Sequence, residues 1–171
     1  VRSLSNGMTI VSYAQPCATS VYVSVSYRVG SDAEQQREWG MAHMIEHMIF
    51  KGTTRMSETD LNAIAEKYLL GSLGAHYNAS TDYHMTQYHF VCDYTSWPIF
   101  LDILADCMRN ARFENEHFSS ELIAVLNELK MRASNGSSKA FESLMCARFP
   151  PSHPYGHAIV GYQESLLDAT A

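Results

Sequence analysis

Three side chains in one short segment, His43, Glu46 and His47, have the types and the spacing of a metal-binding site. They follow the pattern i, i+3 and i+4, so a helix through residues 40–50 would project all three from one face. Two imidazoles one helical turn apart can bind a single metal ion, and a carboxylate beside them can act on a water bound to that ion. The segment therefore predicts a metal site with a general base next to it.

A satisfied pair of core histidines is the alternative interpretation of this segment. All residues from 41 to 50 except these three are apolar. The helix would thus be apolar on nearly all sides, and we expect it to be buried. Three ionisable groups on a buried helix are costly unless something pairs them, and a divalent cation does so. We therefore favour the metal site.

A third metal ligand must come from elsewhere in the chain, because catalytic zinc sites typically use three protein ligands. Glu121 and Glu128 are candidates, since they lie seven residues apart on a predicted helix over 114–133 and share one face with an offset of about 20°. Apolar residues lie near that face, so these carboxylates should point toward the core. Glu142 remains a rival, whereas the acidic residues at the start of the helix are explained by the helix dipole.

The length and composition indicate one globular domain. The chain has 171 residues, of which 46% are hydrophobic and 18% charged, and a formal net charge of −6. With no basic patch, we expect no nucleic-acid or anionic-membrane partner. No apolar run approaches the roughly 20 residues of a membrane span. The chain begins at Val1 without a recognisable signal or transit peptide, so we expect a soluble protein whose compartment the sequence does not record.

The local patterns predict four strands, five complete helices and the start of a sixth. The strands are expected at 7–15, 19–29, 75–80 and 83–93, the first two as a hairpin, and the helices at 40–50, 57–69, 97–112, 114–133 and 138–149. Ser57 with Asp60 resembles a capping box, and Ser96 is the expected N-cap of the third helix. A polar loop over 30–40 has Trp39 as its anchor, a turn follows at 71–74, and a last helix begins near 165.

Several other residues that could bind metals are predicted to be structural. The four cysteines are widely separated without a Cys-x-x-Cys pair, so we expect small buried thiols and no zinc or redox site. The histidines of the third and fourth strands lack ligand spacing and are expected to be sheet or surface residues, namely His76, His84 and His89.

Four segments of the chain resemble a known family. Residues 40–53, GMAHMIEHMIFKGT, resemble the zinc-binding signature of the inverzincins, the pitrilysin-type (M16) metallopeptidases, in which the order is His-x-x-Glu-His. Residues 77–81 with Thr86 and Tyr88 resemble the strand pair beside the active site of that family. Residues 121–132 resemble its downstream ligand helix, and residues 153–161 its following segment. The matches span about residues 7–165, in the family's order.

The resemblance implies a role for each matching residue. His43, His47 and Glu128 would bind Zn²⁺, Glu46 would be the general base, and Glu121 would orient its neighbours as part of the catalytic group. A peptide substrate would bind as an added strand against a segment made of Tyr77, Asn78, Ala79, Ser80 and Thr81.

The resemblance also implies the architecture and the function. We expect an α+β fold in which an antiparallel or mixed sheet packs against several helices, with residues 1–171 as the single, incomplete N-terminal unit of a clamshell. A homologous second half or partner subunit would complete it, and activity of the isolated unit is not assured. The expected function is that of a zinc endopeptidase acting on short or unfolded polypeptides. A non-catalytic scaffold subunit is the alternative, but the intact motif favours the enzyme, and a zinc site that only stabilises the fold would typically use four Cys or His ligands.

Overall fold

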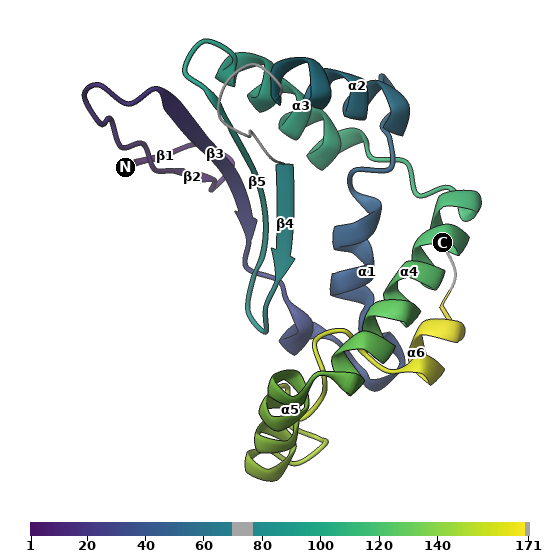
Figure 1. Ribbon diagram of the computed structural model, residues 1–171. Coiled ribbons are helices and arrows are strands. Elements are labelled where there is room, and N and C mark those ends of the chain that lie inside the picture. Colours follow the sequence, from purple (N-terminus) through teal and green to yellow (C-terminus); the bar gives the residue numbers. More distant parts are fainter. Residues whose placement is uncertain (70–76, 170–171) are drawn as a thin grey trace.

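A computed structural model describes residues 1–69 and 77–169 (Figure 1). It mixes helices with antiparallel strands, which confirms the predicted α+β class. Along the chain the elements are β1 (Arg2–Ser3), β2 (Thr9–Ile10), β3 (Ser20–Tyr27), the 3₁₀ turns η1 (Ser31–Ala33) and η2 (Gln36–Glu38), α1 (Met41–Met48), α2 (Glu58–Leu69), β4 (Tyr77–Thr81), β5 (Thr86–Asp93), α3 (Trp97–Asn110), α4 (Asn115–Ser134), α5 (Gly136–Arg148) and α6 (Gln163–Leu167). The expected turn at 71–74 and His76 lie outside the described residues.

The main sheet has three antiparallel strands in the order β3-β5-β4. The central strand β5 pairs with β3 from Thr86 opposite Tyr27 to Asp93 opposite Ser20, and with β4 from Thr86 opposite Thr81. Alternate residues of β5 are buried, as expected for a strand with one face against the core. In the described part of the chain β4 is an edge strand, so one side of its backbone has no strand partner.

The predicted hairpin between 7–15 and 19–29 is wrong. Only Thr9–Ile10 forms a strand in the first segment, and it pairs with β1, while β3 pairs with the distant β5. The turn at Asn6 and Gly7 therefore closes the small β1–β2 ribbon. The long-range pairing is favoured because it places Val21, Val23 and Val25 against the main core, a burial that a local hairpin would not provide.

The helices agree with the predictions except at some ends. Ser57 and Asp60 exchange hydrogen bonds at the start of α2, as the capping box requires. Ser96 does not cap α3 with its side chain, because its hydroxyl donates to Asp93 instead. The fifth helix starts earlier than expected, since the Asn135 side chain, at the end of α4, accepts the backbone N–H of Ser138 and caps α5.

Helix α1 lies between the sheet and α4 (Figure 1). One core joins the sheet to α2 and α3, and it includes Phe90, Phe100 and Leu104. A second core joins α1, α4 and α6, and it includes Met44, Met48, Phe118, Val125 and Leu166. The second core holds α1 against α4, and the first core reaches Ile49 at the C-terminal end of α1. The helix also contacts β4, so it lies between the sheet and α4.

The four cysteines are all free, but only two of them are buried. Cys92 and Cys107 lie in the main core as expected, whereas Cys17 and Cys146 are exposed, contrary to the prediction. Cys17 lies in a turn with φ 68°, and Cys146 lies on α5, a helix with no buried residue. Among the described residues, no helix combines the length and the apolar character that crossing a membrane requires.

Candidate metal centre

Helices α1 and α4 bring His43, His47 and Glu128 together, although 80 residues separate His47 from Glu128. The Oε2 atom of Glu128 lies 3.6 Å from Nε2 of His43 and 3.7 Å from Nε2 of His47. One potential ligand atom of each residue lies within 4.8 Å of the other two. It is the one such group of three within the described residues, and Glu142 is not part of it.

These three residues fit a zinc ion in chemistry and in distance. Two donor atoms bound about 2.0–2.1 Å from one tetrahedral ion lie about 3.4 Å apart, close to the separations seen here. Burial lowers the pKa of His43 to about 4, so its imidazole is neutral near pH 7 and keeps a lone pair for a metal. Nδ1 of His43 is buried and has no hydrogen-bond partner among the described residues, which leaves the tautomer of this ring unfixed by any of their hydrogen bonds.

Glu128 is held as a carboxylate with one oxygen directed at the histidines. Arg132 Nε donates to Oε1 of Glu128 at 2.8 Å, which leaves Oε2 to face both imidazoles. Its interactions with His47 and then with Arg132 lower the pKa of Glu128 to about 2. Its charge and its free oxygen are those that a third metal ligand needs.

Glu121 lies on the other side of the His47 ring. With its proton on Nδ1, His47 donates to Oε2 of Glu121 at 2.9 Å, so Nε2 of His47 is left with the lone pair that faces Glu128. Lys51 Nζ donates to Oε1 of Glu121 at 2.7 Å and also to Oε1 of Glu58 at 2.7 Å. Such carboxylate–histidine pairs fix the tautomer and the orientation of metal-binding histidines.

Lys51 was not among the functional residues predicted from the sequence. Its position four residues after His47 was the available signal, because that spacing repeats the face of α1 just beyond the end of the helix at Met48.

Glu46 faces β4. Thr81 Oγ1 donates to Oε2 of Glu46 at 2.5 Å, and burial raises the pKa of Glu46 while this bond lowers it. The helix around it is less buried than its apolar composition predicted, since Ile45 is 42% exposed. The carboxylate is thus half-buried, beside the histidine pair and oriented by one hydroxyl.

The five predicted substrate-binding residues divide between the two faces of β4. Tyr77, Ala79 and Thr81 are half-buried, and Tyr77 donates from its hydroxyl to Asn62 Oδ1 at 2.6 Å. Asn78 and Ser80 are exposed. Because side chains alternate along a strand, the five cannot face one ligand together, and only the backbone of this edge strand is available along its whole length.

His84 and His89, the two described histidines that were predicted to be sheet or surface residues, are not part of this group. His84 is exposed and pairs with Asp32 at 2.5 Å. His89 stacks on Tyr22, with ring centroids 5.1 Å apart.

Comparison with known proteins gives relatives along nearly the whole chain. The family model described as Insulinase (Peptidase family M16) matches residues 9–159. An uncharacterized zinc protease of Rickettsia felis is 31% identical over 99% of this chain and 40% of the relative. A mitochondrial-processing peptidase subunit beta of Lentinula edodes is 32% identical over 98% of this chain and 34% of the relative.

A solved structure has the same fold. The crystal structure of a protease from Helicobacter pylori superposes with a TM-score of 0.76 and 25% identity, covering 90% of this chain and 36% of that one. The chain thus spans 34–40% of the length of these relatives. On the match to residues 9–159, the chain belongs to the insulinase family, peptidase family M16.

Proposed function

We propose that this chain is the N-terminal unit of a zinc-dependent endopeptidase that hydrolyses short or unfolded polypeptides. The observation that supports the proposal best is the grouping of His43, His47 and Glu128 beside Glu46, whose carboxylate is held by Thr81. The name of the zinc protease of Rickettsia felis and the family match support the same activity.

His43, His47 and Glu128 would hold the zinc ion. When bound, zinc would supply a Lewis acid that polarises a scissile carbonyl and makes water a nucleophile near pH 7. Glu46 would accept the proton of the attacking water as general base and return it to the leaving amine as general acid. The Thr81 hydroxyl occupies Oε2 of Glu46 and leaves Oε1 for the proton transfer.

Two further contacts would keep the ligands in place. Glu121, held by Lys51, would keep Nε2 of His47 directed at the ion, and Arg132 would keep Oε2 of Glu128 directed there. Glu121 thus occupies Nδ1 of His47, and Arg132 occupies Oε1 of Glu128. In each ligand the remaining atom would face the ion.

The peptide would add to the free edge of β4 through its backbone. Such strand addition uses main-chain hydrogen bonds and therefore tolerates many sequences. Asn78 and Ser80 would contact substrate side chains from the exposed face of β4.

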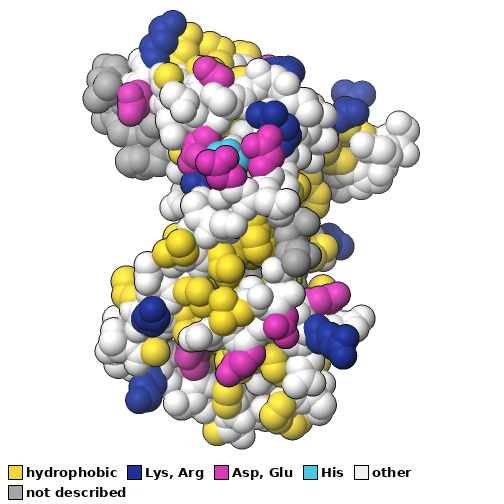
Figure 2. Space-filling view, turned by 90° about the vertical axis from the view of Figure 1, so that its right-hand side faces the viewer, with side chains coloured by type: hydrophobic (Ala, Val, Ile, Leu, Met, Phe, Trp, Pro, Cys, Tyr) yellow, Lys and Arg dark blue, Asp and Glu magenta, His cyan; other side chains and the backbone are white. Residues whose placement is uncertain are grey.

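We propose a homologous second half or a partner subunit that encloses the substrate. The chain spans 34–40% of its relatives, and one of these is by name a subunit. Figure 2 shows hydrophobic side chains gathered on the face of the molecule that includes α4, and Ile123 and Met131 of that helix are 63% and 62% exposed. Exposed apolar surface of this kind is typical of protein contacts.

Glu46→Gln in the complete protein tests the proposal. The variant should bind zinc as the wild type does and should lose peptidase activity by about 100-fold or more, the usual contribution of general acid–base catalysis. Glu66→Gln, an exposed glutamate of α2, is the control. Full activity in Glu46→Gln would contradict the role of Glu46, and a wild type that binds zinc but cleaves no peptide would favour the non-catalytic scaffold.

A further inference from the structure

Helix α1, which bears the candidate metal ligands, begins at a residue that cannot cap it. The N-cap is Gly40, with φ 97°, and no side chain at that position closes the helix. A Cβ on Gly40 would lie 2.7 Å from the carbonyl oxygen of Val160 and 2.9 Å from Cα of Gly161, so residue 40 is restricted to glycine. The free N–H groups of the first turn therefore need an acceptor from another part of the chain.

Glu34 is that acceptor. Its Oε2 accepts the backbone N–H of Gly40 at 2.9 Å, and its Oε1 accepts that of Ala42 at 2.7 Å. The side chain is only 5% exposed. A carboxylate that accepts two N–H bonds at a helix N-terminus also interacts favourably with the helix dipole. Burial raises the pKa of Glu34 to about 7, while the bonds from Ala42 and Gly40 lower it.

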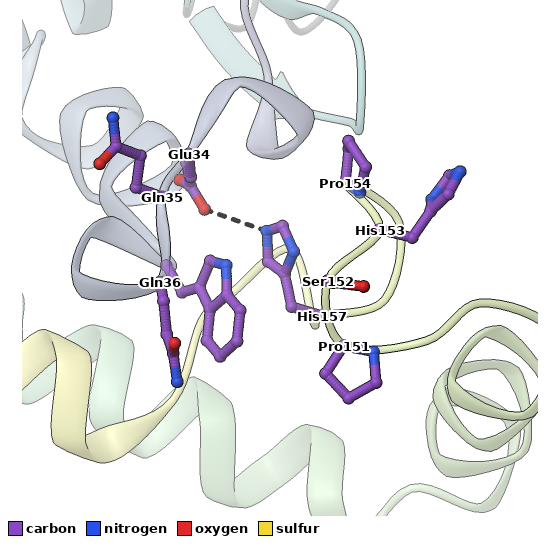
Figure 3. A pocket seen from close by; sticks show the side chains of 9 residues that line it. Glu34, Gln35, Gln36, Pro151, Ser152, His153, Pro154 and His157 are labelled. Atoms are coloured by element: carbon purple, nitrogen blue, oxygen red, sulfur yellow. Dashed lines mark ion pairs between the residues drawn. The ribbon is translucent and has the colours of Figure 1, made fainter.

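The Glu34 carboxylate faces a buried imidazole of a distant loop (Figure 3). Nε2 of His157 lies 3.3 Å from Oε2 of Glu34, and the His157 side chain is 1% exposed. Trp39 stacks on His157 with ring centroids 5.0 Å apart and an interplanar angle of 14°. Through this contact Trp39 anchors its loop, as the sequence predicted. The three side chains line one pocket, where the 150s loop meets the segment that precedes α1.

We propose that Glu34 is a positioning residue that fixes α1, and through α1 the geometry of His43, Glu46 and His47. The helix has only eight residues, about two turns, and His43 lies in the first of them. Helices this short do not hold their conformation by themselves. Loss of the Glu34 bonds would therefore displace His43 directly, although Glu34 touches neither the metal ligands nor the substrate. The inference rests on the proposed function, since it concerns the geometry of that site.

The test compares Glu34→Ala and Glu34→Gln with Glu38→Gln in the complete protein. Glu34→Ala removes both acceptors, and Glu34→Gln keeps one of them. Glu38 is the matched control, because it is exposed, lies on the same loop and accepts a bond from Gln35 outside the helix.

The first readout is amide hydrogen exchange of the metal-free protein, and the second is the Kd for Zn²⁺, measured by competition with a chromophoric chelator. Exchange at both Gly40 and Ala42 should become faster in Glu34→Ala, and exchange at one of them at least should become faster in Glu34→Gln, which keeps one acceptor. The Kd should rise about tenfold in Glu34→Ala and less in Glu34→Gln. This is the lower end of the effect of losing a group that hydrogen-bonds a metal ligand, because Glu34 acts on the ligands only through α1. With a peptide substrate kcat should fall while KM stays near the wild-type value, and Glu38→Gln should change none of these.

Two results would overturn the inference. One is an exchange rate at Gly40 and Ala42 that is unchanged in a folded Glu34→Gln protein. This variant keeps the test decisive even if Glu34→Ala does not fold. The other is faster exchange with a Kd for Zn²⁺ equal to that of the wild type. A wild type that binds no zinc would instead refute the proposed function, and the exchange rates would still decide whether Glu34 holds α1.

Discussion

Replacing Glu121 by glutamine should weaken zinc binding, although residue 121 is not one of the proposed ligands. Each oxygen of Glu121 accepts from one donor, Nδ1 of His47 at 2.9 Å and Nζ of Lys51 at 2.7 Å. Glutamine has the same shape but only one acceptor atom, so in either orientation its NH₂ group faces one of these donors. His47 then loses its partner, or Lys51 repels the amide that replaces it.

The expected loss is about tenfold in Kd for Zn²⁺ with Glu121→Gln and about 100-fold with Glu121→Ala, or about 1.4–2.8 kcal/mol. Glutamine costs less because its oxygen can still serve His47. Lys51→Met should weaken zinc binding less than either change at Glu121, because the Glu121 carboxylate can still accept from His47. In the double variant with Glu121→Gln the two losses should not add, because the glutamine amide no longer faces a cation.

Chelator competition against Zn²⁺ measures these constants, with Glu116→Gln as the control. Glu116 is an exposed residue in the first turn of the same helix, so its substitution changes the net charge equally and touches no ligand. Wild-type affinity in Glu121→Gln would refute the argument that this carboxylate orients His47. Additive losses in the double variant would refute the proposed part of Lys51.

Three further predictions concern the stability of the fold. Gly40→Ala should lower the free energy of unfolding in urea by at least about 2 kcal/mol, because residue 40 has φ 97° and its new Cβ would lie 2.7 Å from a backbone oxygen. Gly136→Ala is the control and should not lower it, because a Cβ there would meet nothing within 4 Å. Val125→Ala should cost about 2–3 kcal/mol in the same assay, because Val125 is 0% exposed in the second core. The pKa of Asp93 is lowered to about 2, chiefly by the Ser96 hydroxyl, so its contribution is complete above the unfolded pKa of about 3.9 and is lost as pH falls toward 2. The difference in unfolding free energy between wild type and Asp93→Asn should therefore shrink between pH 4 and pH 2, and a constant difference would contradict it.

The residues that the sequence predicted well are those whose geometry is local. His43, Glu46 and His47 share a face because a helix repeats every 3.6 residues, and this holds wherever the helix lies in the fold. The same argument placed Glu121 and Glu128 on one face of α4, and the structure puts both beside His47. Their roles at a metal stay predictions.

The features that the sequence did not predict depend on contacts between distant segments. Strand β3 pairs with β5 across more than sixty intervening residues in places, while the two neighbouring strand patterns at 7–15 and 19–29 suggested a local hairpin. Glu34 was missed because a carboxylate in a polar loop is ordinarily solvated, and only the meeting of the 150s loop with this segment buries it. No local pattern contains that information.

The choice between Glu121 and Glu128 as third ligand shows how packing decides what spacing leaves open. Seven residues advance a helix by about 10.5 Å, whereas His43 and His47 are about 6 Å apart along α1, so only one of the two glutamates can lie level with both Nε2 atoms. In the structure it is Glu128, because Phe118 and Val125 pack against Met44 and Met48 and so fix the position of α4 along α1. A shift of α4 by one turn would bring Ala124, which has no donor atom, to the place of Glu128. The choice of Glu128 as the proposed third ligand therefore depends on the apolar residues between the helices as much as on the carboxylate itself.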